Sequence, residues 1–317
     1  MYILSYKLKK INKILISFCS LFLLSSFTFF ILYKNKKICT RASEENKEEN
    51  KKIIKYVEFT PTSDILSDAM KEDIKSHNSD DQIKINWIDL LSYLATKYGG
   101  NFKNYNKKDI TNYVEKVKNG ENPEEKLNNT KLLSYYKEAY GAILSGFLGE
   151  YESDSKKVYG LKVKSPIAYG YSFTHYDDFG ARRTFGYSRP HLGHDIFCST
   201  GTPVVAVEEG RIEIMGWNRY GGWRIGIRSH DNKRYWYYAH LRKNKPFSPN
   251  LKEGDNVKAG DVIGFVGRTG YSSKENVNNI QRSHLHLGLQ LIFDESQKDS
   301  PNQIWISLYE ICKLLKN

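Results

Sequence analysis

The pattern of apolar and polar positions changes repeatedly along the 317-residue chain. Residues 14–33 form an uncharged stretch of roughly 20 residues, which is long enough for a helix to cross a bilayer. Lysines flank the stretch on both sides, so its flanks do not set an orientation. We predict a cytoplasmic tail and uncleaved transmembrane anchor in residues 1–34, with a cleaved signal peptide as the alternative. Residues 35–55 are polar and charge-mixed, which predicts a solvated stalk.

Residues 56–152 follow a helical period. One apolar stripe consists of Trp87, Leu91, Leu94 and Tyr98. Asn86 is suited to cap the start of this helix, and Gly99 is suited to end it. Two further stripes lie in residues 110–117 and 132–147. Together they predict a small all-α accessory domain without a catalytic constellation.

The period falls to two in the remainder of the chain, residues 153–317. Short runs rich in β-branched and aromatic residues are separated by Gly, Asn and Asp at 202–217, 222–230 and 234–241. Residues 284–293 form another such run, and no spacing suits helical crossovers. We predict an antiparallel all-β domain with a two-layer, barrel-like core, closed by a helix over residues 304–315.

Charge and cysteine content narrow the function classes. The formal net charge is +12, which favours polyanionic partners such as nucleic acid, anionic lipid or a cell-wall polymer. No zinc-finger, helix-turn-helix or aromatic RNA-binding motif supports nucleic acid, so we expect no nucleic-acid partner. The 4 cysteines have no CxxC spacing, which excludes a disulfide framework and a cysteine zinc site.

Two histidines stand two residues apart in the strand-like run "SHLHLG". Alternate side chains of a strand share a face, so His284 and His286 point the same way while Leu285 and Leu287 face the opposite layer. The pair therefore offers two nitrogen donors to one site. Zinc prefers a tetrahedral set of His nitrogens and carboxylate oxygens. The spacing alone leaves open whether one or both histidines bind.

A carboxylate accompanies histidines in "RPHLGHDIF". His191 and Asp195 stand four residues apart, with Gly193 between them to allow a close backbone turn. His194 is the competing nitrogen donor. The run "YYAHL" adds His240 at the end of an aromatic strand. A buried, hydrogen-bonded structural histidine is the alternative for each of these residues.

The three strings "HLGHD", "YYAHL" and "SHLHLG", in this order, resemble the lysostaphin/LytM-type zinc metallopeptidases, which cut peptide bonds in bacterial peptidoglycan. The resemblance covers roughly residues 165–315. The longer string "HYDDFGARRTFGYSRPHLGHDIF" and the following "GWNRYGGWRIGIRSHD" resemble the LytH-type L-Ala–D-Glu peptidases of spore-forming bacteria.

This resemblance implies a zinc cofactor with three ligands: His191, Asp195 and His286. It implies that His240 and His284 handle protons and stabilise the oxyanion without binding the metal. His194 is expected beside the site or on the surface. Cys198 departs from the small residue usual in relatives.

Three arginines precede the first expected ligand: Arg182, Arg183 and Arg189. Guanidinium forks match carboxylates, so these residues are candidates for reading the acidic groups of a stem peptide. Solvated surface positions are the alternative for each of them.

Taken together, the sequence predicts an α+β multidomain fold: an N-terminal transmembrane helix, a small all-α domain and a C-terminal antiparallel all-β peptidase domain. The expected function is a membrane-anchored zinc endopeptidase acting on peptidoglycan stem peptides outside the cytoplasm, with the L-Ala–D-Glu bond of the spore cortex as the narrower expectation. The alternative is a catalytically silent scaffold in a sporulation or cell-wall complex. A biotinyl-type carrier would need a modified lysine, and Lys258 lacks the required motif.

Overall fold

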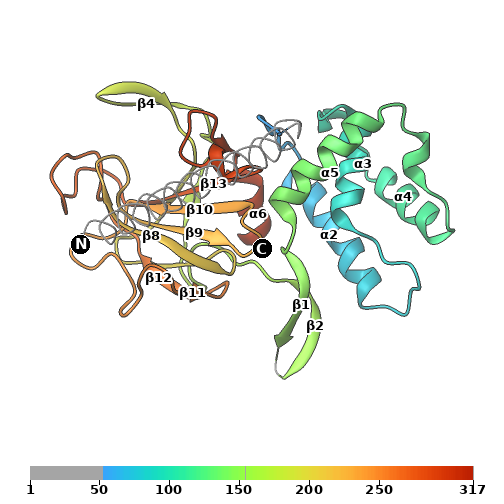
Figure 1. The fold of residues 1–317 in the computed structure, drawn as a ribbon. Coiled ribbons are helices and arrows are strands. Elements are labelled where there is room, and N and C mark those ends of the chain that lie inside the picture. The colour runs from blue at the N-terminus through green and yellow to red at the C-terminus, as the bar shows by residue number, and fades with distance from the viewer. Residues whose placement is uncertain (1–52, 154, 317) are drawn as a thin grey trace, which may run out of the picture. The chain divides into compact units, whose positions relative to one another are not determined.

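Helices form the first part of the chain that the computed structural model describes, which comprises residues 53–153 and 155–316. They are α2 (Ser63–His77), α3 (Trp87–Tyr98), α4 (Lys108–Lys118) and α5 (Thr130–Leu144), with the short 3-10 helices η1 (Phe102–Asn104) and η2 (Pro123–Lys126) between them (Figure 1). Helix α3 has the bounds that its apolar stripe predicts. The Asn86 side chain accepts hydrogen bonds from the first amides of α3, and Gly99, at φ 61°, ends the helix in the left-handed conformation.

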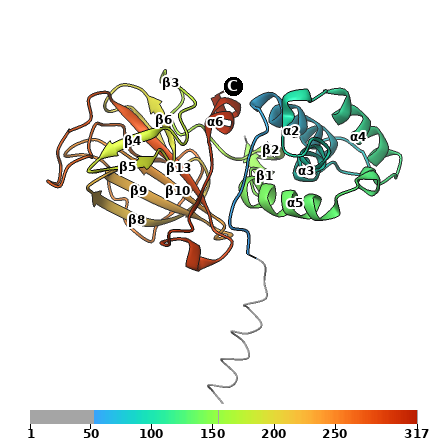
Figure 2. The same cartoon turned by 90° about the horizontal axis from the view of Figure 1, so that it is seen from above.

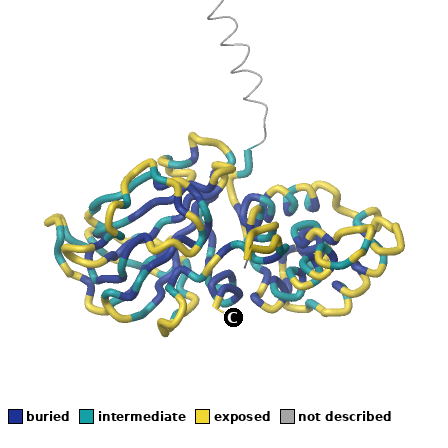
Figure 3. Tube along the Cα trace, turned by 90° about the horizontal axis from the view of Figure 1, so that it is seen from below, coloured by how far each residue is buried: buried dark blue, intermediate teal, exposed yellow. Residues whose placement is uncertain are grey.

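An antiparallel sheet of 8 strands carries the second part, in the order β11-β8-β9-β10-β13-β6-β3 with β14 also paired to β13. The strands are β3 (Thr174–His175), β6 (His194–Phe197), β8 (Gly210–Asn218), β9 (Gly222–Ser229), β10 (Arg234–Ala239), β11 (Asn256–Val257), β13 (His284–Leu291) and β14 (Ile304–Trp305). Figure 2 shows the central strands side by side. Burial follows them (Figure 3): β10 and β13 consist mostly of buried residues, whereas exposed positions gather in the connections.

Further strands pair outside this sheet. Strand β7 (Pro203–Val205) pairs with β12 (Val262–Phe265), and two hairpins, β1 (Leu148–Ser153) with β2 (Lys156–Leu161) and β4 (Arg182–Phe185) with β5 (Tyr187–Pro190), complete the set. The predicted domain junction at residues 152–153 falls inside the first hairpin. The second hairpin leads directly into the segment "HLGHD". The residues just before the hairpin, Gly180 and Ala181, form backbone hydrogen bonds with His191 of that segment.

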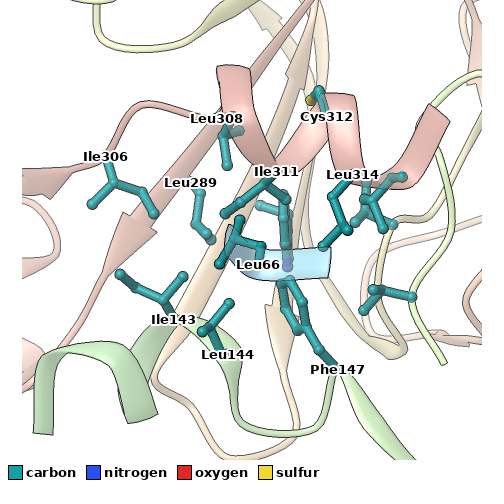
Figure 4. Close-up of a cluster of buried hydrophobic side chains, with 14 of the residues drawn as sticks. Leu66, Ile143, Leu144, Phe147, Leu289, Ile306, Leu308, Ile311, Cys312 and Leu314 are labelled. Carbon is teal, nitrogen blue, oxygen red and sulfur yellow. The ribbon is translucent and has the colours of Figure 1, made fainter. Parts of the chain in front are cut away.

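The helices and the sheet share one hydrophobic cluster. Leu66 of α2 and Ile143 of α5 lie with Leu289 of β13 and Ile311 of the C-terminal helix α6 (Tyr309–Lys316) (Figure 4). The four side chains are at most 2% exposed. Residues from Ile54 onward accordingly form one compact unit, because the apolar faces of both parts cover each other.

A buried ion pair adds a polar contact to this interface. Arg234 and Glu208 are 2% and 6% exposed, and Arg234 Nη2 donates to Glu208 Oε1 at 2.8 Å. The Nη1 atom of Arg234 donates to the carbonyl of Ala142 in α5, also at 2.8 Å. The guanidinium therefore satisfies the Glu208 carboxylate and a helix C-terminal carbonyl together.

The predicted fold class needs a correction in its transmembrane component, which no helix of the described residues supplies. Among residues 53–153 and 155–316, every helix is too short or too polar to cross a bilayer. The segment 14–33, on which the prediction of an anchor rested, lies outside the described residues. What the structure describes is a β-rich domain packed with a group of helices.

The predicted C-terminal helix over residues 304–315 needs a second correction. Ile304 and Trp305 form strand β14, which pairs with β13, and the helix begins only at Tyr309. Tertiary pairing with residues 290–291 of β13, beyond the part paired with β6, overrides the helical period at Ile304 and Trp305.

Candidate metal centre

Three predicted residues bring their donor atoms together at one point of the sheet. Strands β6 and β13 are antiparallel and place Asp195 directly opposite His286, so their side chains share a face. His191 reaches the same point from the segment between β5 and β6. The His286 Nδ1 atom lies 3.1 Å from Asp195 Oδ1 and 2.9 Å from His191 Nε2, and the third side of the triangle, His191 Nε2 to Asp195 Oδ1, is 3.1 Å.

The donor set fits a zinc ion. Zinc with bonds of about 2.0–2.1 Å holds tetrahedral ligand atoms about 3.3 Å apart, close to the sides of this triangle. Asp195 Oδ1 carries no proton when ionised, and two imidazole nitrogens cannot both donate to it and to each other. A shared cation satisfies all three lone pairs at once, and two histidines with one carboxylate are a usual zinc set.

The surroundings of the cluster set its protonation. Although burial opposes it, hydrogen bonds from His191 and His286 hold the pKa of Asp195 well below its usual range. For His286, burial itself is the main cause and lowers the pKa. Burial also acts against protonation of His191, but its hydrogen bonds to Asp178 and Asp195 outweigh burial and raise its pKa to about 9. A bound cation therefore has to displace a proton from His191.

Sequence reasoning missed Asp178, which positions His191. The Nδ1 atom of His191 lies 3.2 Å from both the carbonyl and the Oδ2 atom of Asp178. These contacts fix the ring so that Nε2 faces the cluster. The only sequence signal for this role was the presence of an acidic residue upstream of His191. Local periodicity could not predict that this residue contacts the histidine.

Arg183 has a different role from the one considered for it. Its Nη2 atom bonds Asp178 and also lies 3.2 Å from Asp195 Oδ2. Because its charge is matched by two carboxylates of the chain, Arg183 holds the cluster together and is not a free reader of substrate acids.

Gly193 is required by close packing. A Cβ at this position would lie 2.4 Å from His286 Cε1 and 2.9 Å from the Leu287 carbonyl. The glycine predicted to permit a close turn thus permits the approach of the His286 ring.

His284 and His240 stand beside the cluster. Nδ1 of His284 lies 2.8 Å from the Arg282 carbonyl, and Nδ1 of His240 lies 2.9 Å from the Thr269 carbonyl. A carbonyl only accepts, so in each neutral ring Nδ1 carries the proton and Nε2 the lone pair. His284 Nε2 is 3.7 Å from Asp195 Oδ1. The centroids of the His240 and His284 rings are 4.9 Å apart.

The backbone of His240 is unusual. It has φ 61°, a left-handed conformation that costs free energy for a residue with a Cβ, directly after the last residue of β10. Burial lowers the pKa of this histidine well below its usual value, which keeps the ring neutral. The strained turn aims the imidazole at the cluster.

His194 and Cys198 lie outside the cluster. His194 is 1% exposed and shares the opposite face of β6, where its Nε2 atom lies 2.8 Å from His175 Nδ1. Burial lowers its pKa to about 4. Of the two positions expected for His194, beside the site or on the surface, burial excludes the surface. Burial raises the pKa of Cys198 to about 11, so its thiol stays protonated at neutral pH.

A cavity of about 470 Å³ opens onto the cluster. His191, His240 and His286 line one part of it, and Tyr220 and Tyr271 also line it. This space is large enough for a short peptide segment. An antiparallel sheet that assembles this donor triangle, with two further histidines beside it, defines a metallopeptidase-type centre.

Comparisons with known proteins agree with this class. Residues 189–299 match peptidase family M23. Residues 189–299 thus carry a domain that matches this family and is similar to lysostaphin.

Relatives of known name support this assignment. The L-Ala–D-Glu endopeptidase of Bacillus subtilis is 43% identical over 124 residues, which cover 39% of this chain and 36% of that protein. Lysostaphin of Staphylococcus simulans is 43% identical over 89 residues, covering 28% of this chain and 17% of that protein. The chain thus spans about a third or less of the length of these relatives.

A solved structure extends the likeness in fold beyond the sheet. A protein from Ruminococcus gnavus, assigned as a glycyl-glycine endopeptidase LytM, superposes with a TM-score of 0.53 at 22% identity. The match covers 80% of this chain and 87% of that one. At this identity the likeness concerns the fold alone.

Proposed function

We propose that this chain is a zinc endopeptidase that hydrolyses peptide bonds in the stem peptides of peptidoglycan. The observation that supports the proposal is the triangle of His191 Nε2, Asp195 Oδ1 and His286 Nδ1, with sides of 2.9–3.1 Å. The likeness to the L-Ala–D-Glu endopeptidase of Bacillus subtilis favours L-Ala–D-Glu as the bond cleaved.

The three residues of the triangle are the ligands in this proposal. Zinc held by them would supply a Lewis acid that polarises the scissile carbonyl and lowers the pKa of a water ligand toward ~7. Asp195 neutralises one of the two positive charges, so the site keeps a net charge that attracts the carbonyl oxygen. Asp178 and Arg183 keep His191 and Asp195 in place.

His284 and His240 share the proton transfers. Each ring is held by a backbone carbonyl at Nδ1 and has its lone pair on Nε2. One Nε2 takes the proton from the attacking water and the proton then passes to the leaving amine. A ring that carries the proton also stabilises the negative charge that develops on the carbonyl oxygen.

The place of action follows from the substrate. Peptidoglycan lies outside the cytoplasm, so we place the catalytic domain there, and the net charge of +12 suits an anionic wall. Action in the spore cortex is the narrower form of the proposal, and it rests on the resemblance of the segment around residues 175–197.

Digestion of purified peptidoglycan with the full chain tests the proposal. Mass analysis of released fragments should show new N-terminal D-Glu when zinc is supplied and no release with a chelator. New N-terminal glycine or another D-amino acid would move the proposal to a different bond. A zinc-loaded chain that releases nothing would support the silent scaffold instead.

A further inference from the structure

Two arginines face each other across the β4–β5 hairpin beside the metal centre. Arg183 and Arg189 are direct cross-strand partners, so their side chains leave the hairpin on the same side. Both line the cavity that opens onto the donor triangle. Like charges in this position destabilise a hairpin unless each is matched. Arg183 is matched by Asp178 and Asp195.

Arg189, by contrast, has no carboxylate partner among the described residues. Its guanidinium lies between two aromatic rings, with Cζ 4.8 Å from the centroid of Tyr220 and 5.2 Å from that of Tyr271. Its Nη1 atom is buried and has no hydrogen-bond partner among the described residues. A buried donor of this kind costs free energy until a ligand satisfies it.

Tyr271 connects Arg189 with the reaction centre. The Tyr271 ring that packs against Arg189 also lies 5.6 Å, centroid to centroid, from His240. A single aromatic ring therefore separates the guanidinium from a proposed proton-transfer residue. Phe185 packs on Tyr220 and Tyr271 and holds the hairpin against them.

The other cations of the cavity are less suited to bind an acid at this place. Lys298 pairs with Glu213. Arg224 also has a buried donor, Nε, without a partner among the described residues, but the ring that its Cζ contacts is Tyr237, at 6.0 Å, and not either of the two that hold Arg189. The rings of Tyr220 and Tyr271 contact the Arg189 guanidinium, whose planar fork matches a carboxylate in bidentate geometry.

We propose that Arg189 binds a carboxylate of the peptide substrate next to the scissile bond and so selects an acidic residue there. This inference rests on the proposed function and deepens it. A glutamate residue in a stem peptide carries one carboxylate that is not used in the chain linkage. Docking of that carboxylate on Arg189 places the neighbouring peptide bond toward His240 and the donor triangle.

A pair of peptides tests the inference with the full zinc-loaded chain. One is the stem peptide L-Ala–D-Glu–diamino acid–D-Ala, and the other has the free carboxylate of the D-Glu residue converted to the amide. We expect the wild-type chain to cleave the acid with a kcat/KM at least ~10-fold above that of the amide, since charged hydrogen bonds are worth this much or more.

Variants at position 189 separate recognition from folding. Arg189→Gln should lower kcat/KM for the acid by ~10–100-fold, with little change for the amide, so that the preference disappears. Arg189→Lys should restore part of it, because an ammonium keeps the charge and loses the fork. Arg182→Gln, an exposed arginine of the same hairpin, is the matched control and should keep the wild-type preference. Zinc content and melting temperature should be equal in all four proteins.

Two outcomes overturn the inference while leaving the proposed function intact: equal cleavage of both peptides by the wild type, or an equal loss on both peptides in Arg189→Gln. Cleavage of neither peptide, nor of whole peptidoglycan, overturns the proposed function and the inference with it.

Discussion

The His286 ring lies against the backbone of Gly193, where an added Cβ would come within 2.4 Å of Cε1 and 2.5 Å of Nε2. The same Cβ would lie 2.9 Å from the Leu287 carbonyl, so backbone as well as the ring would have to shift. Gly193→Ala should therefore displace the ring and weaken zinc binding by at least tenfold, measured by competition with a chelator. Gly141→Ala, whose new Cβ meets nothing closer than 3.9 Å, should bind zinc as the wild type does.

Removal of any one of the three donors should abolish zinc binding. His191→Ala, Asp195→Ala and His286→Ala each take one corner from the triangle, and we expect zinc content to fall from about one per chain to near zero after dialysis. His230→Ala, at an exposed histidine, serves as the control. Full zinc content in any of the three variants would contradict the ligand set.

Loss of His240 or His284 should spare the metal. Their Nδ1 atoms are bound to backbone carbonyls, so His240→Ala and His284→Ala should keep about one zinc per chain. Turnover on peptidoglycan should fall by ~10²–10⁴-fold, the usual contribution of a positioned acid or base. Loss of zinc together with activity in either variant would show that the residue contributes to metal binding, against the role proposed for it.

Asp178 should act on the metal through His191. Removal of the carboxylate at 3.2 Å from His191 Nδ1 leaves the carbonyl of residue 178 as the acceptor for that nitrogen, beside Arg183 Nη2 at 3.3 Å. Asp178→Ala should weaken zinc binding by ~10–100-fold without abolishing it. Unchanged affinity would mean that the carbonyl is sufficient.

The buried Arg234–Glu208 pair should stabilise helices and sheet together. Glu208→Ala leaves a guanidinium that is 2% exposed without its main counter-charge, which typically costs about 3–5 kcal/mol in the free energy of unfolding. Because Arg234 also bonds Ala142 in α5, helical and aromatic signals should shift to the same lower denaturant midpoint. Two separated transitions would contradict this coupling.

The donors of the centre were predictable because strand alternation is a strong constraint. A period of two places His284 and His286 on one face, and the β6–β13 register then brings Asp195 opposite His286. Spacing alone did not decide which histidine of the pair approaches most closely. The structure resolves this, since His286 Nδ1 lies 3.1 Å and His284 Nε2 lies 3.7 Å from Asp195 Oδ1.

The residues around the donors were not predictable from local pattern. The β4–β5 hairpin packs through Phe185 on Tyr220 and Tyr271, and Asp178 contacts Arg183 and His191; no periodicity encodes these contacts. The left-handed turn at His240 likewise depends on the bond to Thr269. Asn86 and Gly99, by contrast, set the bounds of α3 through local hydrogen bonds and were predictable.

The cluster shared by α2, α5 and α6 limits how this protein can be shortened. An excised piece confined to residues 189–299 would lack strand β14 and the whole of α6, leaving Leu289 without its cover. Such a fragment should aggregate on expression, however complete its metal-binding residues are. Chimeras and minimal catalytic versions should therefore exchange the helices and the sheet as one block.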